Sequence, residues 1–307
     1  MSVSKEDEKF RRLVHTIDPQ SRLIRTWELK GGVSAQVTAL EIERSDGRPE
    51  KMIVRQHGAA DLKQNPRVAA DEWRLLRLLR SVGLATPMPL YLDVSGEIFS
   101  TPVIVLEYIE GKPELVPSDL DDCVLQLATH LFRIHSVDCT TLDLSFLPTQ
   151  AKKLGKKLRE RPINVDESLA EGRIRDILES VWPLPQQNRS VLLHGDFWPG
   201  NTLWQDGRLV AVIDWEDAER GDPLADVANS RLEILWAFGI DAMQSFTADY
   251  ASMTNIDWAN LPYWDLCAAL RPASRIAEWA GNDVIEQTMR AGHRVFITQA
   301  FDKLSIR

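Results

Sequence analysis

The first hundred residues alternate between short apolar stretches and polar turns, a pattern typical of β-structure. Three segments, residues 22–29, 36–43 and 51–56, are strand candidates, and turn residues separate them. Two hairpins in succession predict a three-stranded antiparallel meander. Two further strands are expected near residues 90–93 and 102–108.

Helical spacing dominates the rest of the chain. Asn65 and Pro66 are typical of a helix start, so we expect a helix from there to about Arg80. Beyond residue 111, apolar residues recur every three or four positions, which predicts helices in the segments 118–137, 224–238, 241–252, 263–280 and 283–303. Strands followed by helices indicate an α+β fold with two domains, residues 1–110 and 111–307.

The composition is that of an ordinary globular protein. Of 307 residues, 44% are hydrophobic and 26% charged, which excludes disordered and collagen-like chains. Three widely spaced cysteines argue against a disulfide framework or a zinc site and fit a reducing compartment. The sequence shows no secretory signal and no membrane-spanning run, so a cytoplasmic protein is expected. The net charge of −9 argues against a nucleic-acid partner.

One short β-rich segment, residues 191–215, interrupts the helices and carries polar residues suited to phosphate chemistry. Asp206-Gly207 between two apolar runs predicts a two-residue hairpin. In that register Asn201 and Asp214 lie at the same open end of the ribbon. Their amide and carboxylate oxygens are hard ligands of the kind that Mg²⁺ accepts beside nucleotide phosphates.

A third carboxylate, Asp196, lies on the loop that leads into this hairpin. At that position it could orient a hydroxyl group and accept its proton. The alternative is an ordinary hairpin with polar ends and a capping aspartate. The combination of Asp196 with Asn201 and Asp214, with His194 just before, favours phosphoryl transfer.

These residues also carry a family resemblance. His194-Gly-Asp196 with Asn201, followed by Asp214-Trp215, resembles the aminoglycoside phosphotransferase family, small-molecule relatives of protein kinases. The resemblance implies a bilobal protein-kinase-like fold. An N-terminal antiparallel sheet lobe with one long helix would bind the nucleotide, and a mainly helical C-terminal lobe would hold the catalytic loop and the acceptor. It further implies that Asp196 is the catalytic base and that Asn201 and Asp214 bind Mg²⁺.

A kinase site also needs a cation for the nucleotide phosphates and an acidic partner for it. Glu72 falls on the apolar stripe of the helix expected before Arg80, and a buried carboxylate is costly without a partner. Lys51 and Arg55 share one side of the third strand. By resemblance Arg55 is the phosphate-binding position, where the family's best-known members have lysine, and it would pair with Glu72.

Two other segments are candidates for nucleotide contacts. Gly32 and Ser34 lie between the first two strands, where backbone N–H groups and the hydroxyl could cover phosphates. A plain turn is the alternative. By resemblance the segment from Glu107 to Ile109 is a hinge whose backbone would bind the purine edge, although Tyr108 could equally be a half-buried strand aromatic.

The resulting hypothesis is an ATP- or GTP-dependent O-phosphotransferase that acts on a hydroxyl of a small molecule. Aminoglycosides and other antibiotics are candidate acceptors, and a macrolide or an amino-alcohol metabolite is the alternative. A non-catalytic nucleotide-binding protein of the same fold is a second alternative. Acidic residues that could form a wall for a cationic acceptor are Glu216, Asp217, Glu219, Asp257, Asp265 and Glu278.

Overall fold

The computed structural model describes residues 5–29 and 35–305, which fall into two compact units. The first, called here the N-unit, comprises Met1–Glu110 and Ala211–Glu216, and the second, the C-unit, comprises Gly111–Val210 and Asp217–Arg307. The segment Ala211–Glu216 therefore joins the N-unit although the residues on either side of it belong to the C-unit. It is tied there by the Val212 N–H, which donates to the Ala85 carbonyl at 2.8 Å.

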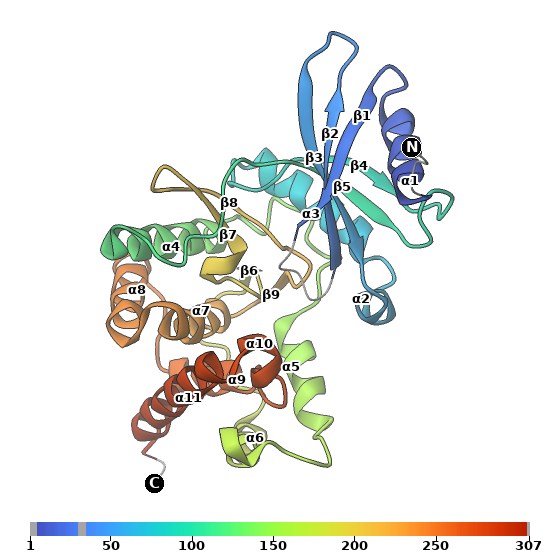
Figure 1. Ribbon diagram of the computed structural model, residues 1–307. Coiled ribbons are helices and arrows are strands. Elements are labelled where there is room, and N and C mark those ends of the chain that lie inside the picture. The colour runs from blue at the N-terminus through green and yellow to red at the C-terminus, as the bar shows by residue number, and fades with distance from the viewer. Residues whose placement is uncertain (1–4, 30–34, 306–307) are drawn as a thin grey trace. The chain divides into compact units, whose positions relative to one another are not determined.

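The N-unit contains a five-stranded antiparallel sheet, which includes the predicted three-stranded meander and the two further strands that were expected (Figure 1). The strand order is β1-β2-β3-β5-β4. The bounds are β1 Arg22–Glu28, β2 Ala35–Glu43, β3 Pro49–His57, β4 Pro89–Asp93 and β5 Val103–Glu107. In the middle of the sheet Val54 pairs with Thr38 on one side and with Val105 on the other.

One face of this sheet is covered by a helix that the sequence analysis missed, α1 (Lys5–Ile17). Its apolar side packs Phe10, Leu13 and Val14 into a core with residues of β2, β3 and β5. Met52 and Val54 point into this core. Because side chains alternate along a strand, Arg55 points from β3 to the opposite face.

The long predicted helix is α3 (Val68–Ser81), and its buried side includes Glu72, as the apolar spacing indicated. The predicted start at Asn65 was wrong. Asn65 ends a short helix, α2 (Ala59–Gln64), and its Oδ1 accepts the Arg67 N–H at 2.9 Å. This side chain therefore closes a turn between two helices instead of capping the second one.

The C-unit is mainly helical. Its helices are α4 Leu120–His135, α5 Gln150–Arg159, α6 Glu171–Val181, α7 Pro223–Phe238, α8 Ile240–Met253, α9 Leu261–Ala269, α10 Ile276–Ala280 and α11 Asp283–Lys303, with short 3₁₀ turns at Glu167–Leu169 and Pro199–Asn201. The single helix expected over 263–280 is broken into α9 and α10. Arg271-Pro272 follows α9, and proline removes the N–H that a continuous helix would need.

Two small antiparallel ribbons carry the motif residues. β6 (Val191–Leu193) pairs with β9 (Glu219–Gly221), and β7 (Thr202–Gln205) pairs with β8 (Arg208–Val212). Asp206 and Gly207 connect β7 and β8 with φ of 50° and 73°, the conformation expected for the predicted two-residue turn. Within the described residues, no helix has both the length and the apolar character needed to cross a membrane.

Candidate active site

The loop after β6 is held by one buried carboxylate, Asp226 on α7. Its two oxygens accept the backbone N–H groups of His194, at 2.6 Å, and Gly195, at 2.9 Å. The ring of His135 lies 3.2 Å from the same carboxylate and bonds Tyr250 through its other nitrogen at 2.6 Å. Both N–H groups that precede Asp196 are therefore held by the same buried carboxylate.

This arrangement also keeps Asp226 charged. Burial raises the pKa of its carboxyl group, but the hydrogen bond and charge of His135 and the N–H donors of the loop outweigh it, so the net pKa is lowered. An ionised carboxylate is a stronger acceptor for N–H groups than a neutral one.

Gly195 is required by a close approach of two backbone segments. Its φ is 82°, and a Cβ at this position would lie 2.2 Å from the carbonyl oxygen of Asp217. No other residue type fits without moving the backbone that carries Asp196.

The structure brings Asp196 and Asn201 together within the C-unit. The Asn201 side-chain N–H₂ donates to the Asp196 backbone carbonyl at 2.9 Å and to Asp196 Oδ2 at 3.0 Å. Because its nitrogen makes these bonds, the Oδ1 atom of Asn201 is the one left for a cation.

A residue that the sequence analysis missed also contacts Asp196. Arg271, just after α9, donates from Nη2 to Asp196 Oδ1 at 2.5 Å and from Nη1 to the Gly195 carbonyl at 2.6 Å. Arg271 lies 75 positions along the chain from Asp196, so no local pattern links the two. The one sequence signal was Pro272, which ends the helix where Arg271 turns toward the loop.

In the N-unit the guanidinium of Arg55 is surrounded by three carboxylates. Its Nη2 donates to Asp214 Oδ1 at 2.5 Å and to Glu216 Oε2 at 2.6 Å, and its Nε lies 3.6 Å from Glu72 Oε2. The predicted Arg55–Glu72 ion pair is present, but Asp214 and Glu216 are the closer partners. Glu216 was considered as an acceptor wall residue, and the structure places it in this cluster instead.

Charge and burial act in opposite directions within the cluster. Burial would lower the pKa of Arg55, but its carboxylate partners hold it well above the ordinary value. Burial raises the pKa of Asp214, with Arg55 opposing and Glu216 adding to the rise. The two carboxylates that share one guanidinium therefore repel each other, which favours a further cation nearby.

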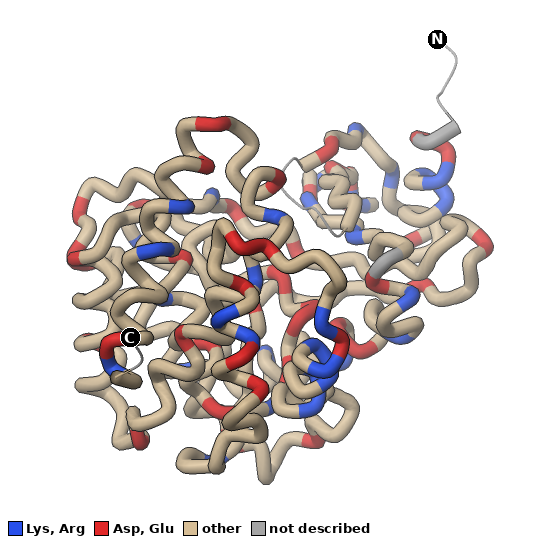
Figure 2. The backbone as a smooth tube through the Cα atoms, turned by 90° about the horizontal axis from the view of Figure 1, so that it is seen from below, with Lys and Arg blue, Asp and Glu red and all other residues tan. Residues whose placement is uncertain are grey.

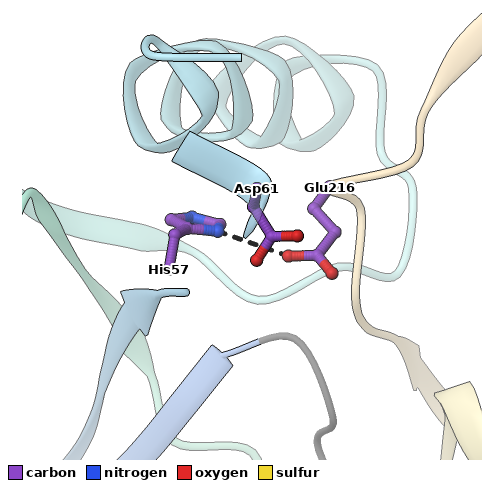
Figure 3. Close-up of side chains that lie close together, drawn as sticks. All are labelled: His57, Asp61 and Glu216. Atoms are coloured by element: carbon purple, nitrogen blue, oxygen red, sulfur yellow. Dashed lines mark ion pairs between the residues drawn. The ribbon is translucent and has the colours of Figure 1, made fainter. Parts of the chain in front are cut away.

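His57 supplies that cation (Figure 3). Its Nδ1 lies 3.3 Å from Glu216 Oε2, and its Nε2 lies 3.1 Å from Glu72 Oε2. Burial alone would lower its pKa, but Glu216 and Glu72 raise it to about 9. His57, Asp61 and Glu216 also offer ligand atoms within 4.8 Å of one another, which a metal could use only after His57 loses its proton.

The other residues predicted to contact the nucleotide are Gly32, Ser34, Glu107 and Ile109. Gly32 and Ser34 lie outside the described residues. The Glu107 N–H donates to the Met88 carbonyl at 2.8 Å, so this donor is already used inside the sheet. Only the Glu107 carbonyl and the backbone of Ile109 therefore stay as candidates for the purine edge.

We predict that His57→Gln flattens the pH dependence of stability. Because folding raises the pKa of His57 from 6.5 to about 9, its stabilising contribution is complete below about pH 6.5 and is lost as the pH rises to about 9. The wild type should lose up to about 3 kcal/mol of unfolding free energy over this window. Urea unfolding at pH 6, 7.5 and 9 measures this, with the exposed His15→Gln as control. An unchanged slope in His57→Gln would contradict the assignment.

We also predict that Asp226→Ala destabilises the chain by about 3–5 kcal/mol, because it leaves buried N–H groups and His135 without their acceptor. Hydrogen exchange should show lost protection at the Gly195 amide. The exposed Asp241→Asn on α8 is the matched control. If the Gly195 amide keeps its wild-type protection in Asp226→Ala, Asp226 does not hold this loop.

Comparison with known proteins agrees with this geometry. The sequence model of the phosphotransferase enzyme family matches residues 28–265. The mouse protein Acyl-CoA dehydrogenase family member 10 is 30% identical over 198 residues, which cover 59% of this chain and 18% of that protein. Rat Acyl-CoA dehydrogenase family member 11 is 26% identical over 65% of this chain and 29% of its own length. The chain thus spans less than a third of these relatives. Viomycin phosphotransferase of Streptomyces vinaceus is 28% identical over 50% of this chain and 58% of its own length.

Solved structures confirm the predicted fold class. Macrolide 2'-phosphotransferase type I superposes with a TM-score of 0.66 at 18% identity, covering 95% of this chain and 98% of that one. The GDP complex of aminoglycoside 2'-phosphotransferase-IIIa gives 0.63 at 16% identity, covering 98% of each chain. The α+β fold of this chain is therefore the kinase-like fold of these proteins. With the match over residues 28–265, the chain belongs to the phosphotransferase enzyme family.

Proposed function

We propose that this enzyme transfers the γ-phosphoryl group of ATP or GTP to a hydroxyl group of a small molecule. The hydroxyl proton passes to Asp196, the hydroxyl oxygen bonds to the γ-phosphorus, and the bond to the β-phosphate oxygen breaks, which releases the nucleoside diphosphate. The observation that carries the proposal is the Asp196–Asn201 pair on a loop fixed by Asp226. A scaffold protein would have no need of a carboxylate held in this way.

Asn201 and Asp214 are the proposed Mg²⁺ ligands. The donor set fits, because the hydrogen bonds of the Asn201 nitrogen leave its Oδ1 as a hard ligand and Asp214 supplies a carboxylate oxygen. The two residues belong to different units, so their meeting at one ion rests on the hairpin argument from the sequence. Mg²⁺ bound there would neutralise charge on the nucleotide phosphates.

Arg55 is the proposed ligand of those phosphates. Its planar guanidinium suits a bidentate contact, and Glu72 and His57 hold the surrounding charges in place. Its Nη2 donates to Asp214 and to Glu216. Nucleotide binding would therefore exchange a carboxylate contact for a phosphate contact. The Glu107 carbonyl and Ile109 would bind the purine, and Gly32 and Ser34 would cover the phosphates.

The names of the relatives define the acceptors to be tested. Viomycin and macrolide phosphotransferases point to antibiotics, whereas the relatives named as acyl-CoA dehydrogenases point to hydroxylated acyl thioesters. Aminoglycosides and amino alcohols complete the panel. An enzyme should release nucleoside diphosphate slowly with Mg²⁺ even without an acceptor, and a non-catalytic binding protein should not.

Asp196→Asn is expected to lower acceptor phosphorylation and acceptor-free hydrolysis by at least about 100-fold, because the amide cannot accept the proton. The nucleotide Kd should change less than about threefold, since Asp196 is proposed to contact the hydroxyl and not the nucleotide. A coupled ADP-release assay and fluorescent-nucleotide binding measure the two quantities. Asp206→Asn in the hairpin turn is the control, because asparagine tolerates its φ of 50°. Wild-type turnover in Asp196→Asn would refute its role as base.

Asp214→Ala is expected to abolish the Mg²⁺-dependent part of nucleotide binding. Titration of the nucleotide in Mg²⁺ and in EDTA should give different Kd values for the wild type and for the Asp206→Asn control, and equal values for Asp214→Ala. A retained Mg²⁺ effect in Asp214→Ala would show that the metal is bound elsewhere.

A further inference from the structure

Both carboxylate oxygens of the proposed base have partners within the C-unit. Arg271 binds Asp196 Oδ1 at 2.5 Å, and Asn201 binds Oδ2 at 3.0 Å. The guanidinium occupies the oxygen that a base would present to a hydroxyl group, so the contact has to loosen before Oδ1 can accept a hydrogen bond from the acceptor. About two thirds of the surface of the Arg271 side chain is shielded from solvent. If its guanidinium separates from Asp196, this partly buried charge needs another anion as partner.

Other cations lie next to Arg271. Lys157 on α5 donates to the Leu270 carbonyl at 3.4 Å, directly before Arg271 in the chain. Partial loss of hydration, together with the charges of Arg271 and Arg175, lowers the pKa of Lys157 to about 8. Within the described chain Lys157 has no carboxylate at ion-pair distance. The basic residues of α5 form a run of blue along the tube (Figure 2).

Two carboxylates of this region are already paired with other cations. Asp217 is paired with Lys153 at 2.7 Å, and the buried Asp265 is paired with Arg231 at 3.1 Å. Loss of hydration, and then the charge of Asp196, raises the pKa of Glu233 to about 8, so this group is mostly neutral at pH 7. Asp217 and Asp265, two of the acidic residues considered as contacts for a cationic acceptor, are thus already engaged in ion pairs within the protein.

We propose that the acceptor carries an anionic group, a carboxylate or a phosphate, and that Arg271 binds this group with help from Lys157. The proposal rests on the phosphotransferase function proposed above and names the class of its acceptor. When the acceptor enters, Arg271 exchanges the carboxylate of Asp196 for the anion of the ligand. Asp196 Oδ1 is then free to accept the hydroxyl proton, so only an acceptor that brings its own anion activates the base.

The test uses matched probes with the full-length chain, Mg²⁺ and ATP labelled at the γ-phosphorus. Short hydroxycarboxylic acids are compared with their primary amides, and sugar phosphates with the unphosphorylated sugars. Kanamycin and choline represent cationic acceptors. We expect kcat/KM for the anionic member of a pair to exceed that of its neutral partner at least tenfold. The two kinds of pair distinguish a carboxylate from a phosphate.

Arg271→Gln should lower kcat/KM for the anionic probe by roughly 100-fold and bring the anionic-to-neutral ratio close to one. Arg275→Gln removes the same charge from an exposed site four residues later and should leave that ratio unchanged. Transfer to kanamycin, choline or a neutral probe with an efficiency equal to that of the anionic probes would overturn the proposal. An Arg271→Gln variant that keeps the wild-type ratio would do the same.

If none of the probes is phosphorylated, calorimetric titration decides. With Mg²⁺ and a non-hydrolysable nucleotide present, at least one acid or sugar phosphate should bind to the wild type and to Arg275→Gln but not to Arg271→Gln. No binding by any anionic probe would refute the proposed anion site. Failure of the phosphotransferase function itself is recognised separately, by the absence of both Mg²⁺-dependent nucleotide binding and acceptor-free hydrolysis.

Discussion

The buried guanidinium of Arg55 is the constraint around which the N-unit is organised. A charge removed from water has to be paired, and three carboxylates and one imidazole converge on this site. Glu72 comes from α3 and His57 from the end of β3. Asp214 and Glu216 come from the segment Ala211–Glu216, which belongs to the N-unit although the residues on either side of it belong to the C-unit. The unit thus holds the proposed phosphate ligand and one proposed metal ligand in a single network.

The C-unit also contains a buried charge that has to be paired, in this case a negative one. Asp226 is a buried anion whose acceptors fix the loop from His194 to Asp196, and Gly195 lets that loop pass close to the backbone of Asp217. The backbone that leads to Asp196 is thus held by contacts that do not involve the Asp196 side chain. Preorganisation of this kind is what phosphoryl transfer requires, because most of its catalysis is positioning.

Local sequence patterns predicted many of the elements and contacts of both units. The turn at Asp206-Gly207 and the buried side of α3 follow from nearest-neighbour geometry. A cation of the third strand was expected to pair with Glu72, and the family resemblance favoured Arg55 over Lys51. Arg271 could not be found in this way, because its contact depends on how α9 packs in the C-unit. Helix α1 was missed because charged residues surround its four apolar positions. The break after α9 is encoded by Arg271-Pro272, because the proline interrupts the helix although the apolar spacing continues.

The central proposal is that Asn201 and Asp214 are ligands of the same metal ion. Electron–nuclear double resonance of Mn²⁺ bound with a non-hydrolysable nucleotide measures this most directly, with ¹³C in the side chains of asparagine or aspartate. The account predicts the ¹³C coupling of a directly bound ligand in the asparagine-labelled sample and in the aspartate-labelled sample. The asparagine coupling should be lost in Asn201→Ala, and the aspartate coupling should be lost in Asp214→Ala. A coupling from only one of the two residues, or from neither, would contradict it.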